Sequence, residues 1–250
     1  MREVDPELIE QVLGGIHATL GRYHSFSLVG GEHIPREGSL LGITTHGMAT
    51  YDLFLTAYAI YKASGRPVRA LGDAIWFRTE RSASIFERLG MVNTQPEVAR
   101  QLLDEGHVVA VAPGGLREAI RPSTQRFRVD WKGRSGFARL ALEAQKPILL
   151  AACPAADLIY TLYDNPLTTF AYRKWKVPLP IMRGLGPSLI PRPVRLTTYC
   201  SPTFLPPKIA RERATEDEVQ AYRVELTDKM NNFIREICAK EGLFPESPSR

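Results

Sequence analysis

The sequence has few of the features that mark membrane-spanning, secreted or metal-binding proteins. It contains only three cysteines, Cys153, Cys200 and Cys238, which are isolated and lack the spacing of a metal site. We expect them to be reduced, mostly buried residues of a cytosolic protein, with no metal and no bound cofactor. No apolar run approaches the roughly 20 residues that span a bilayer. The first residues are too polar for a secretory signal.

Internal repeats and long linkers are also missing, which favours a single domain. A chain of 250 residues can bury one sizeable core. We expect an N-terminal helix over residues 1–22, an α/β core over 23–206, a C-terminal helix over 215–242 and a mobile tail over 243–250.

Acidic residues are absent between positions 165 and 200, in a chain whose formal net charge is +5. Basic and aromatic side chains alternate there, an arrangement that suits an anionic membrane surface. A solvated basic loop carries equal weight. No recognised nucleic-acid motif accompanies the charge, so no nucleic-acid partner is expected, whereas coenzyme A phosphates or an acidic acyl carrier protein suit it. The basic residues are Arg173, Lys174, Lys176, Arg183, Arg192 and Arg195, and the aromatic ones are Phe170, Tyr172 and Trp175.

What the chain does contain is a regular alternation of apolar strand runs with helical patterns. This alternation predicts an α/β fold with a central mixed, largely parallel sheet flanked by helices. Asp5 and Pro6 have the residue types of a helix start, and Thr215 to Glu218 form a capping box before the last helix. Strands are expected at 40–43, 68–71, 108–112, 148–153 and 195–200, and helices at 51–58, 97–105 and 136–145.

A histidine and an aspartate form the first candidate site. His46 follows the strand run 40–43, and Asp52 lies in the first turn of the next helix. The carboxylate can meet the imidazole across the loop and hold the tautomer that leaves the other ring nitrogen free as a base. The alternative is that Asp52 serves the helix dipole and His46 is an ordinary polar residue.

A glycine-rich turn forms the second candidate site. The strand run 108–112 leads into Pro113, Gly114 and Gly115, and then into Arg117 and Glu118. Glycines allow close approach to a ligand, and a guanidinium can reach a phosphate or an oxyanion. Because open α/β sheets place their sites at the carboxyl ends of strands, the two motifs together favour one active site.

These motifs resemble the glycerolipid acyltransferase family, and its mono- and diacylglycerol acyltransferase-like branch in particular. The family's first block, Asn-His-x4-Asp, is similar to Thr45-His46-x5-Asp52. Its third block, Pro-Glu-Gly-Thr-Arg, is similar to the segment from Pro113 to Glu118. Residues 29–35, 131–138 and 146–150 also look like this branch, and the resemblance runs from about 26 to 204.

The resemblance implies an O-acyltransferase that moves a fatty acyl group from acyl-CoA or acyl carrier protein to a lipid hydroxyl. It implies His46 as general base, Asp52 as its orienting partner, and the Gly114 and Gly115 amides with Arg117 at the oxyanion or a donor phosphate. Glu118 is expected to fix Arg117. Lys132 and Arg134 are weaker candidates for phosphate contacts.

One departure from the family pattern bears on the acceptor. The family's second block usually carries an arginine for the acceptor phosphate, but residues 89–95 contain none. This favours a neutral glyceride of the mono- or diacylglycerol type, or another lipid alcohol, over a lysophospholipid, although Arg88 or Arg100 can replace the charge. The chain is expected on the cytoplasmic face of a membrane as a peripheral protein. The alternatives are an acyl-thioester hydrolase and an inactive lipid-binding module.

Overall fold

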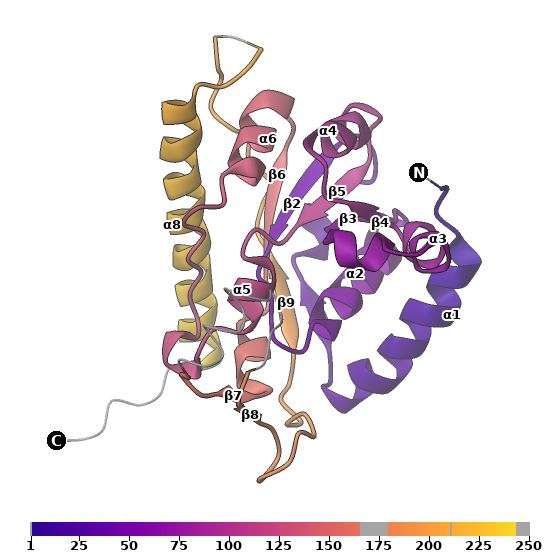
Figure 1. Ribbon diagram of the computed structural model, residues 1–250, viewed down its shortest axis with the longest axis vertical. Coiled ribbons are helices and arrows are strands. Elements are labelled where there is room, and N and C mark those ends of the chain that lie inside the picture. Colours follow the sequence, from indigo (N-terminus) through magenta and orange to yellow (C-terminus); the bar gives the residue numbers. More distant parts are fainter. Residues whose placement is uncertain (1, 166–179, 211, 244–250) are drawn as a thin grey trace, which may run out of the picture.

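The computed structural model describes residues 2–165, 180–210 and 212–243, and it has the predicted α/β architecture: a seven-stranded sheet with helices on both faces (Figure 1). The strand order is β1-β9-β6-β2-β5-β3-β4. The strands are β1 (Ser27–Val29), β2 (Leu40–Thr44), β3 (Val68–Gly72), β4 (Met91–Asn93), β5 (Val108–Val111), β6 (Ile148–Ala152) and β9 (Thr197–Cys200).

The sheet is mixed and largely parallel, as predicted. β2 pairs in parallel with β5 on one side and with β6 on the other, so that Leu41 lies opposite both Val109 and Ile148. β9 is antiparallel to β6 and parallel to β1. The carboxyl ends of β2, β5 and β6 therefore meet side by side at one end of the sheet, which is where a site is expected.

The helices form two layers. α4, α6 and α8 cover one face, and α1 and α2 pack together on the other (Figure 1). The helices are α1 (Pro6–Ile16), α2 (Tyr51–Ser64), α3 (Glu80–Arg88), α4 (Pro96–Asp104), α5 (Gly115–Ala119), α6 (Gly136–Ala144) and α8 (Glu216–Glu241). A π-helical turn, His17–Gly21, continues α1.

The expected caps are present. The Asp5 carboxylate accepts a hydrogen bond from the Leu8 N–H at the start of α1. At the start of α8, Thr215 and Glu218 form the reciprocal capping box. Across the part of the chain that the structure describes, no helix is both long and apolar enough to cross a bilayer.

A small two-stranded sheet lies at the end of the molecule where a site is expected. β7 (Thr161–Leu162) pairs antiparallel with β8 (Met182–Arg183), and the 3₁₀ turn η5 (Pro154–Leu158) connects β6 to β7. Part of the basic, aromatic stretch predicted to meet a membrane lies outside the described residues, as do residues 244–250 of the expected mobile tail.

Candidate active site

Three neighbouring strands deliver the polar residues of the site. β2 leads to His46, β5 leads to Pro113 and the short helix α5, and β6 leads through η5 to Asp157. The two sequence motifs therefore do meet at one end of the sheet. Asp157 is a residue that the sequence reasoning missed, although its position just after a buried strand was a usable signal.

The His46 ring is held in one tautomer by a backbone carbonyl. Its Nδ1 lies 2.9 Å from the carbonyl oxygen of Gly47. A carbonyl can only accept, so Nδ1 carries the proton and Nε2 presents its lone pair. None of the described residues hydrogen-bonds Nε2. Burial lowers the pKa of His46 below its usual value, although the Gly47 carbonyl and Glu118 oppose this. The ring is therefore a neutral base at physiological pH.

Asp52 does not contact the imidazole in the predicted way. Among the described residues, no hydrogen bond joins Asp52 to His46, and the Gly47 carbonyl takes the role expected of the carboxylate. Asp52 is buried behind Gly47, where a Cβ on the glycine would lie 3.1 Å from Oδ2. The backbone N–H of Gly47 also favours the charged carboxylate. Asp52 can thus act on His46 only through the Gly47 peptide.

The surroundings of Asp52 disfavour its charge. Burial is the largest influence and raises the pKa of the carboxyl to about 6. Its Oδ1 is buried without a hydrogen-bond partner among the described residues. Nearby, Thr50 has a φ of 59°, a left-handed conformation that is strained for a β-branched residue. The segment from His46 to Asp52 therefore contains a strained backbone conformation and a buried carboxyl, both of which lower the stability of the protein.

Glu118 is the centre of the polar network, and the prediction that it fixes Arg117 is wrong. Its Oε1 accepts from the backbone N–H of His46 at 2.8 Å, and its Oε2 accepts from Trp131 Nε1 at 2.9 Å. The side chain is only 3% exposed. Burial raises the pKa of Glu118, while Arg121 and the two N–H donors favour its ionised form. Glu118 fixes the backbone of the histidine itself.

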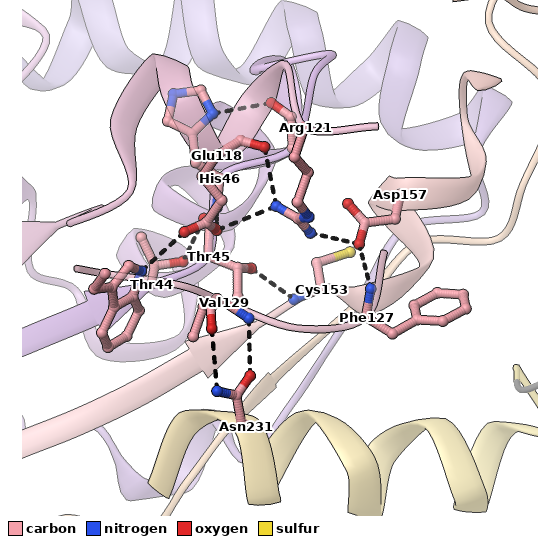
Figure 2. A network of polar contacts seen from close by, with 12 residues as sticks. Thr44, Thr45, His46, Glu118, Arg121, Phe127, Val129, Cys153, Asp157 and Asn231 are labelled. Carbon is pink, nitrogen blue, oxygen red and sulfur yellow. Dashed lines mark hydrogen bonds and ion pairs between the residues drawn. The ribbon is translucent and has the colours of Figure 1, made fainter. Parts of the chain in front are cut away.

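Arg121 joins the two outer strands of the site. Its guanidinium lies between Glu118, 3.6 Å from Oε1, and Asp157, whose Oδ2 it also hydrogen-bonds (Figure 2). Asp157 also accepts from the Phe127 N–H at 2.8 Å. Because the Arg121 and Asp157 side chains are both about 15% exposed or less, this pairing is screened less than a surface ion pair. It links the segment after β5 to the segment after β6.

The Pro113-Gly114-Gly115 turn makes room for the Glu118 carboxylate, and its Gly115 amide is hydrogen-bonded to the backbone. A Cβ on Gly114 would lie 2.0 Å from Glu118 Oε2, so only glycine leaves room for the buried carboxylate. The Gly115 N–H is engaged by the Ala112 carbonyl at 3.1 Å. The Gly115 amide is therefore not free to hold an oxyanion, contrary to expectation.

The three predicted cations lie at the surface. Arg117 is exposed, and its Nη1 is 3.5 Å from the backbone carbonyl of Lys132. Lys132 and Arg134 follow Trp131, which is fully buried against Glu118. The structure thus places Arg117 beside Lys132, and Trp131 connects this cationic surface to the interior network around His46.

A small cavity adjoins the histidine. It measures about 10 Å³, roughly the space of one water molecule, and is bordered by His46, Arg121, Asp157 and Ile234 of α8. The site therefore combines an oriented neutral base, a buried ionic network and nearby surface cations. This arrangement can abstract a proton from a hydroxyl and support the negative charge of a substrate.

Comparison with known proteins places the chain in a family. A profile of the acyltransferase family matches residues 26–153. A protein of Bos taurus named "DGAT1/2-independent enzyme synthesizing storage lipids" is 30% identical over 80% of this chain and 59% of its own length. The Homo sapiens protein of that name is 28% identical over 89% of this chain and 64% of its own. The chain thus spans about 60% of the length of these relatives.

A solved structure shares the fold. The 1-acyl-sn-glycerophosphate (LPA) acyltransferase PlsC from Thermotoga maritima superposes with a TM-score of 0.54, covering 88% of this chain and 79% of that one, at 15% identity. The profile match covers both strand-end motifs, including His46 and the segment from Pro113 to Glu118. The prediction from the motifs is confirmed, and the chain belongs to the glycerolipid acyltransferase family.

Proposed function

We propose that the chain transfers a fatty acyl group from an acyl thioester to the hydroxyl of a lipid acceptor. The observation that carries this is the fixed tautomer of His46: Nδ1–H donates to the Gly47 carbonyl, and none of the residues that the structure describes hydrogen-bonds Nε2. Nε2 removes the hydroxyl proton as the acceptor oxygen attacks the thioester carbonyl. The new C–O bond replaces the C–S bond, and the leaving thiolate takes the proton from the imidazolium.

The donor is an acyl thioester of coenzyme A or of acyl carrier protein. Both carry phosphate, and Arg117, Lys132 and Arg134 supply exposed cations beside the Trp131–Glu118 contact. No cofactor takes part in this reaction. Asp52 and Glu118 are positioning residues, because each acts on His46 through the backbone.

The acceptor that the geometry favours is a neutral glyceride of the mono- or diacylglycerol type. The two arginines able to replace the missing phosphate-binding arginine are both engaged elsewhere. Arg88 pairs with Asp5, and Arg100 lies within ion-pair distance of Asp104 and Glu143. The mammalian relatives, which their names describe as synthesizing storage lipids, support the same choice over a lysophospholipid.

Acyl transfer to a panel of acceptors tests the proposal. Thiol release from a long-chain acyl-CoA is followed with monoacylglycerol, diacylglycerol, lysophosphatidate or a fatty alcohol, and the products are identified by mass. We expect ester formation with monoacylglycerol or diacylglycerol, reduced about 10²–10⁴-fold in His46→Ala. Thiol release without ester would assign a hydrolase. Lipid binding without turnover on either acyl-CoA or acyl carrier protein would assign a binding module.

The acceptor also implies a location. A glyceride with long acyl chains resides in a membrane or lipid droplet rather than in water, so the enzyme has to work at a lipid surface. We place the chain on the cytoplasmic face of a membrane as a peripheral protein.

A further inference from the structure

We propose that residues 181–190, here called the apolar loop, dock the protein to an anionic membrane surface. Leu185, Leu189 and Ile190 enter the interfacial region of the bilayer, while neighbouring arginines contact lipid headgroups. The inference rests on the proposed function, because it identifies the part of the molecule that brings the site to its lipid acceptor. Four observations carry it: the exposure of the loop, its internal hydrogen bonding, its charge and its position.

Exposed apolar side chains are concentrated in this loop. Of the 13 large apolar residues that are exposed in the described parts of the chain, four fall within these ten residues. Such a concentration marks an interaction surface, whereas apolar side chains exposed singly need no explanation. The four are Ile181 (52% exposed), Leu185 (51%), Leu189 (62%) and Ile190 (57%).

The backbone of the loop is folded on itself. The Gly184 N–H donates to the Ser188 carbonyl at 2.7 Å, and the Leu185 N–H donates to the Ile190 carbonyl at 2.8 Å. A Cβ on Gly184 would lie 1.9 Å from that same carbonyl, so this closure needs glycine. Because these backbone groups are satisfied within the loop, its insertion does not carry them unpaired into an apolar phase.

The side chain of Arg192 attaches the loop to the body of the protein through hydrogen bonds. Arg192 donates to the carbonyl of Leu158 at 3.1 Å, to Thr161 Oγ1 at 2.8 Å and to the carbonyl of Arg183 at 3.2 Å. On the other side, the Tyr23 hydroxyl donates to the Pro191 carbonyl at 2.6 Å. The apolar side chains are therefore presented by a fixed scaffold.

The charge around the loop matches an anionic surface. Arg183 within the loop and Arg195 just after it are both exposed. No acidic residue occurs from 165 to 200. One exposed carboxylate, Asp164, lies next to the loop, because the preceding Tyr163 donates its N–H to the Ile181 carbonyl, so the two arginines outnumber it. Each well-placed cation near an anionic leaflet adds attraction to apolar insertion, and the combination is typical of peripheral membrane binding.

The loop lies at the end of the molecule that carries the site. β7 and the apolar loop, which begins with β8, lie at the lower end of the view, below α5 (Figure 1). The Leu162 N–H of β7 bonds Ser123 Oγ at 2.9 Å, just after α5. η5 contributes Asp157 to the active-site network and the Leu158 carbonyl to Arg192. The loop and His46 therefore lie at the same end of the molecule, so a membrane bound by the loop would be next to the active site.

Vesicle binding of the full chain tests the inference. The variant Leu185→Ser/Leu189→Ser/Ile190→Ser is compared with the control Leu205→Ser/Val224→Ser, whose residues are similarly exposed but lie elsewhere. Vesicles of phosphatidylcholine with and without phosphatidylglycerol are sedimented with each protein. We expect wild type and control to bind, more tightly with phosphatidylglycerol, and the loop variant to bind about tenfold or more weakly. Equal binding by all three proteins would overturn the inference.

A fluorescent probe gives a second readout. All three native cysteines are buried, so Leu189→Cys can be labelled selectively with an environment-sensitive dye, and Leu205→Cys serves as control. Vesicles should shift the emission of the probe at position 189 to the blue and leave that at 205 unchanged. Unchanged emission at 189 in bound protein, or a loop variant that loses only self-association or affinity for acyl carrier protein, would refute membrane docking.

Activity on short-chain, water-soluble substrates separates this inference from the proposed function. The loop variant should keep wild-type turnover on them, and His46→Ala should keep wild-type vesicle binding. If the protein binds vesicles through the loop but transfers no acyl group, the docking surface is supported and the proposed reaction is refuted.

Discussion

The interior of this molecule has two regions that contrast in chemistry. Under α8 it is apolar, with Leu226 and Met230 fully buried and Asn231 adding hydrogen bonds to the backbone of Val129 (Figure 2). At the carboxyl end of the sheet it holds two buried carboxylates, Asp52 and Glu118, beside the half-buried His46. The first region stabilises the fold by removing apolar surface from water. The second keeps charges where they cost stability, which is expected of a site selected for chemistry.

The largest effect on stability should come from the apolar region. Leu226→Ala removes a fully buried side chain from the contact between α8 and the sheet, so we expect the free energy of unfolding to fall by about 2–5 kcal/mol. Urea unfolding measures it. Val224→Ala on the same helix, where the side chain is 46% exposed, is the matched control and should change little. Equal losses in the two variants would show that α8 is not the core element described.

A smaller effect on stability than that of Leu226→Ala is expected at Gly114, which contacts Glu118, whereas Gly136 lies in open space. Gly114→Ala would force the Glu118 carboxylate off the His46 N–H, which should cost about 1–3 kcal/mol of stability and lower the acyl-transfer rate. Gly136→Ala, at an open position in α6, should be neutral. Chemical denaturation and the transfer assay check both. A fully active Gly114→Ala would mean that Glu118 does not position the histidine.

Replacement of Asp52 should raise the stability of the protein, whereas the substitutions above lower it. Its pKa is raised from 3.8 to about 6, so its contribution to stability is fully present below about pH 4 and lost as the pH rises through 6. Asp52→Asn should therefore unfold less readily at pH 8, by about 1–3 kcal/mol, and show a flatter stability profile between pH 4 and 6. It should also slow acyl transfer. Lower stability at pH 8 would show that the carboxylate supports the fold.

The sequence could predict the central strands because they are buried on both faces. The runs at 40–43, 108–112 and 148–153 are continuous and apolar, and they became β2, β5 and β6 within one residue at each boundary. α3 was not predicted, because its nine residues include only two large apolar ones, Ile85 and Phe86, and none of the nine is buried. β4, at three residues, is too short to show a period.

The sequence could predict where the site lies in the fold, but not which hydrogen bonds join its residues. The rule that sites lie at strand ends brought His46 and the Pro113 turn together, since β2 and β5 are neighbours. It could not show that Gly47 rather than Asp52 orients the imidazole, because a backbone carbonyl leaves no trace in residue type. Arg121 and Trp131 were missed as partners of Glu118 for a similar reason: side-chain direction within a turn is decided by packing.

Catalysis and stability reside in different regions of this molecule, and one paired measurement on two variants checks this separation. Ester formation from acyl-CoA and urea unfolding are measured for His46→Ala and Leu226→Ala, with activity taken well below the unfolding transition. We predict that His46→Ala loses about 10²–10⁴-fold in rate with its unfolding free energy within about 1 kcal/mol of wild type, and that folded Leu226→Ala stays active. Ester formation by His46→Ala at the wild-type rate would show that this histidine is not the base of the reaction.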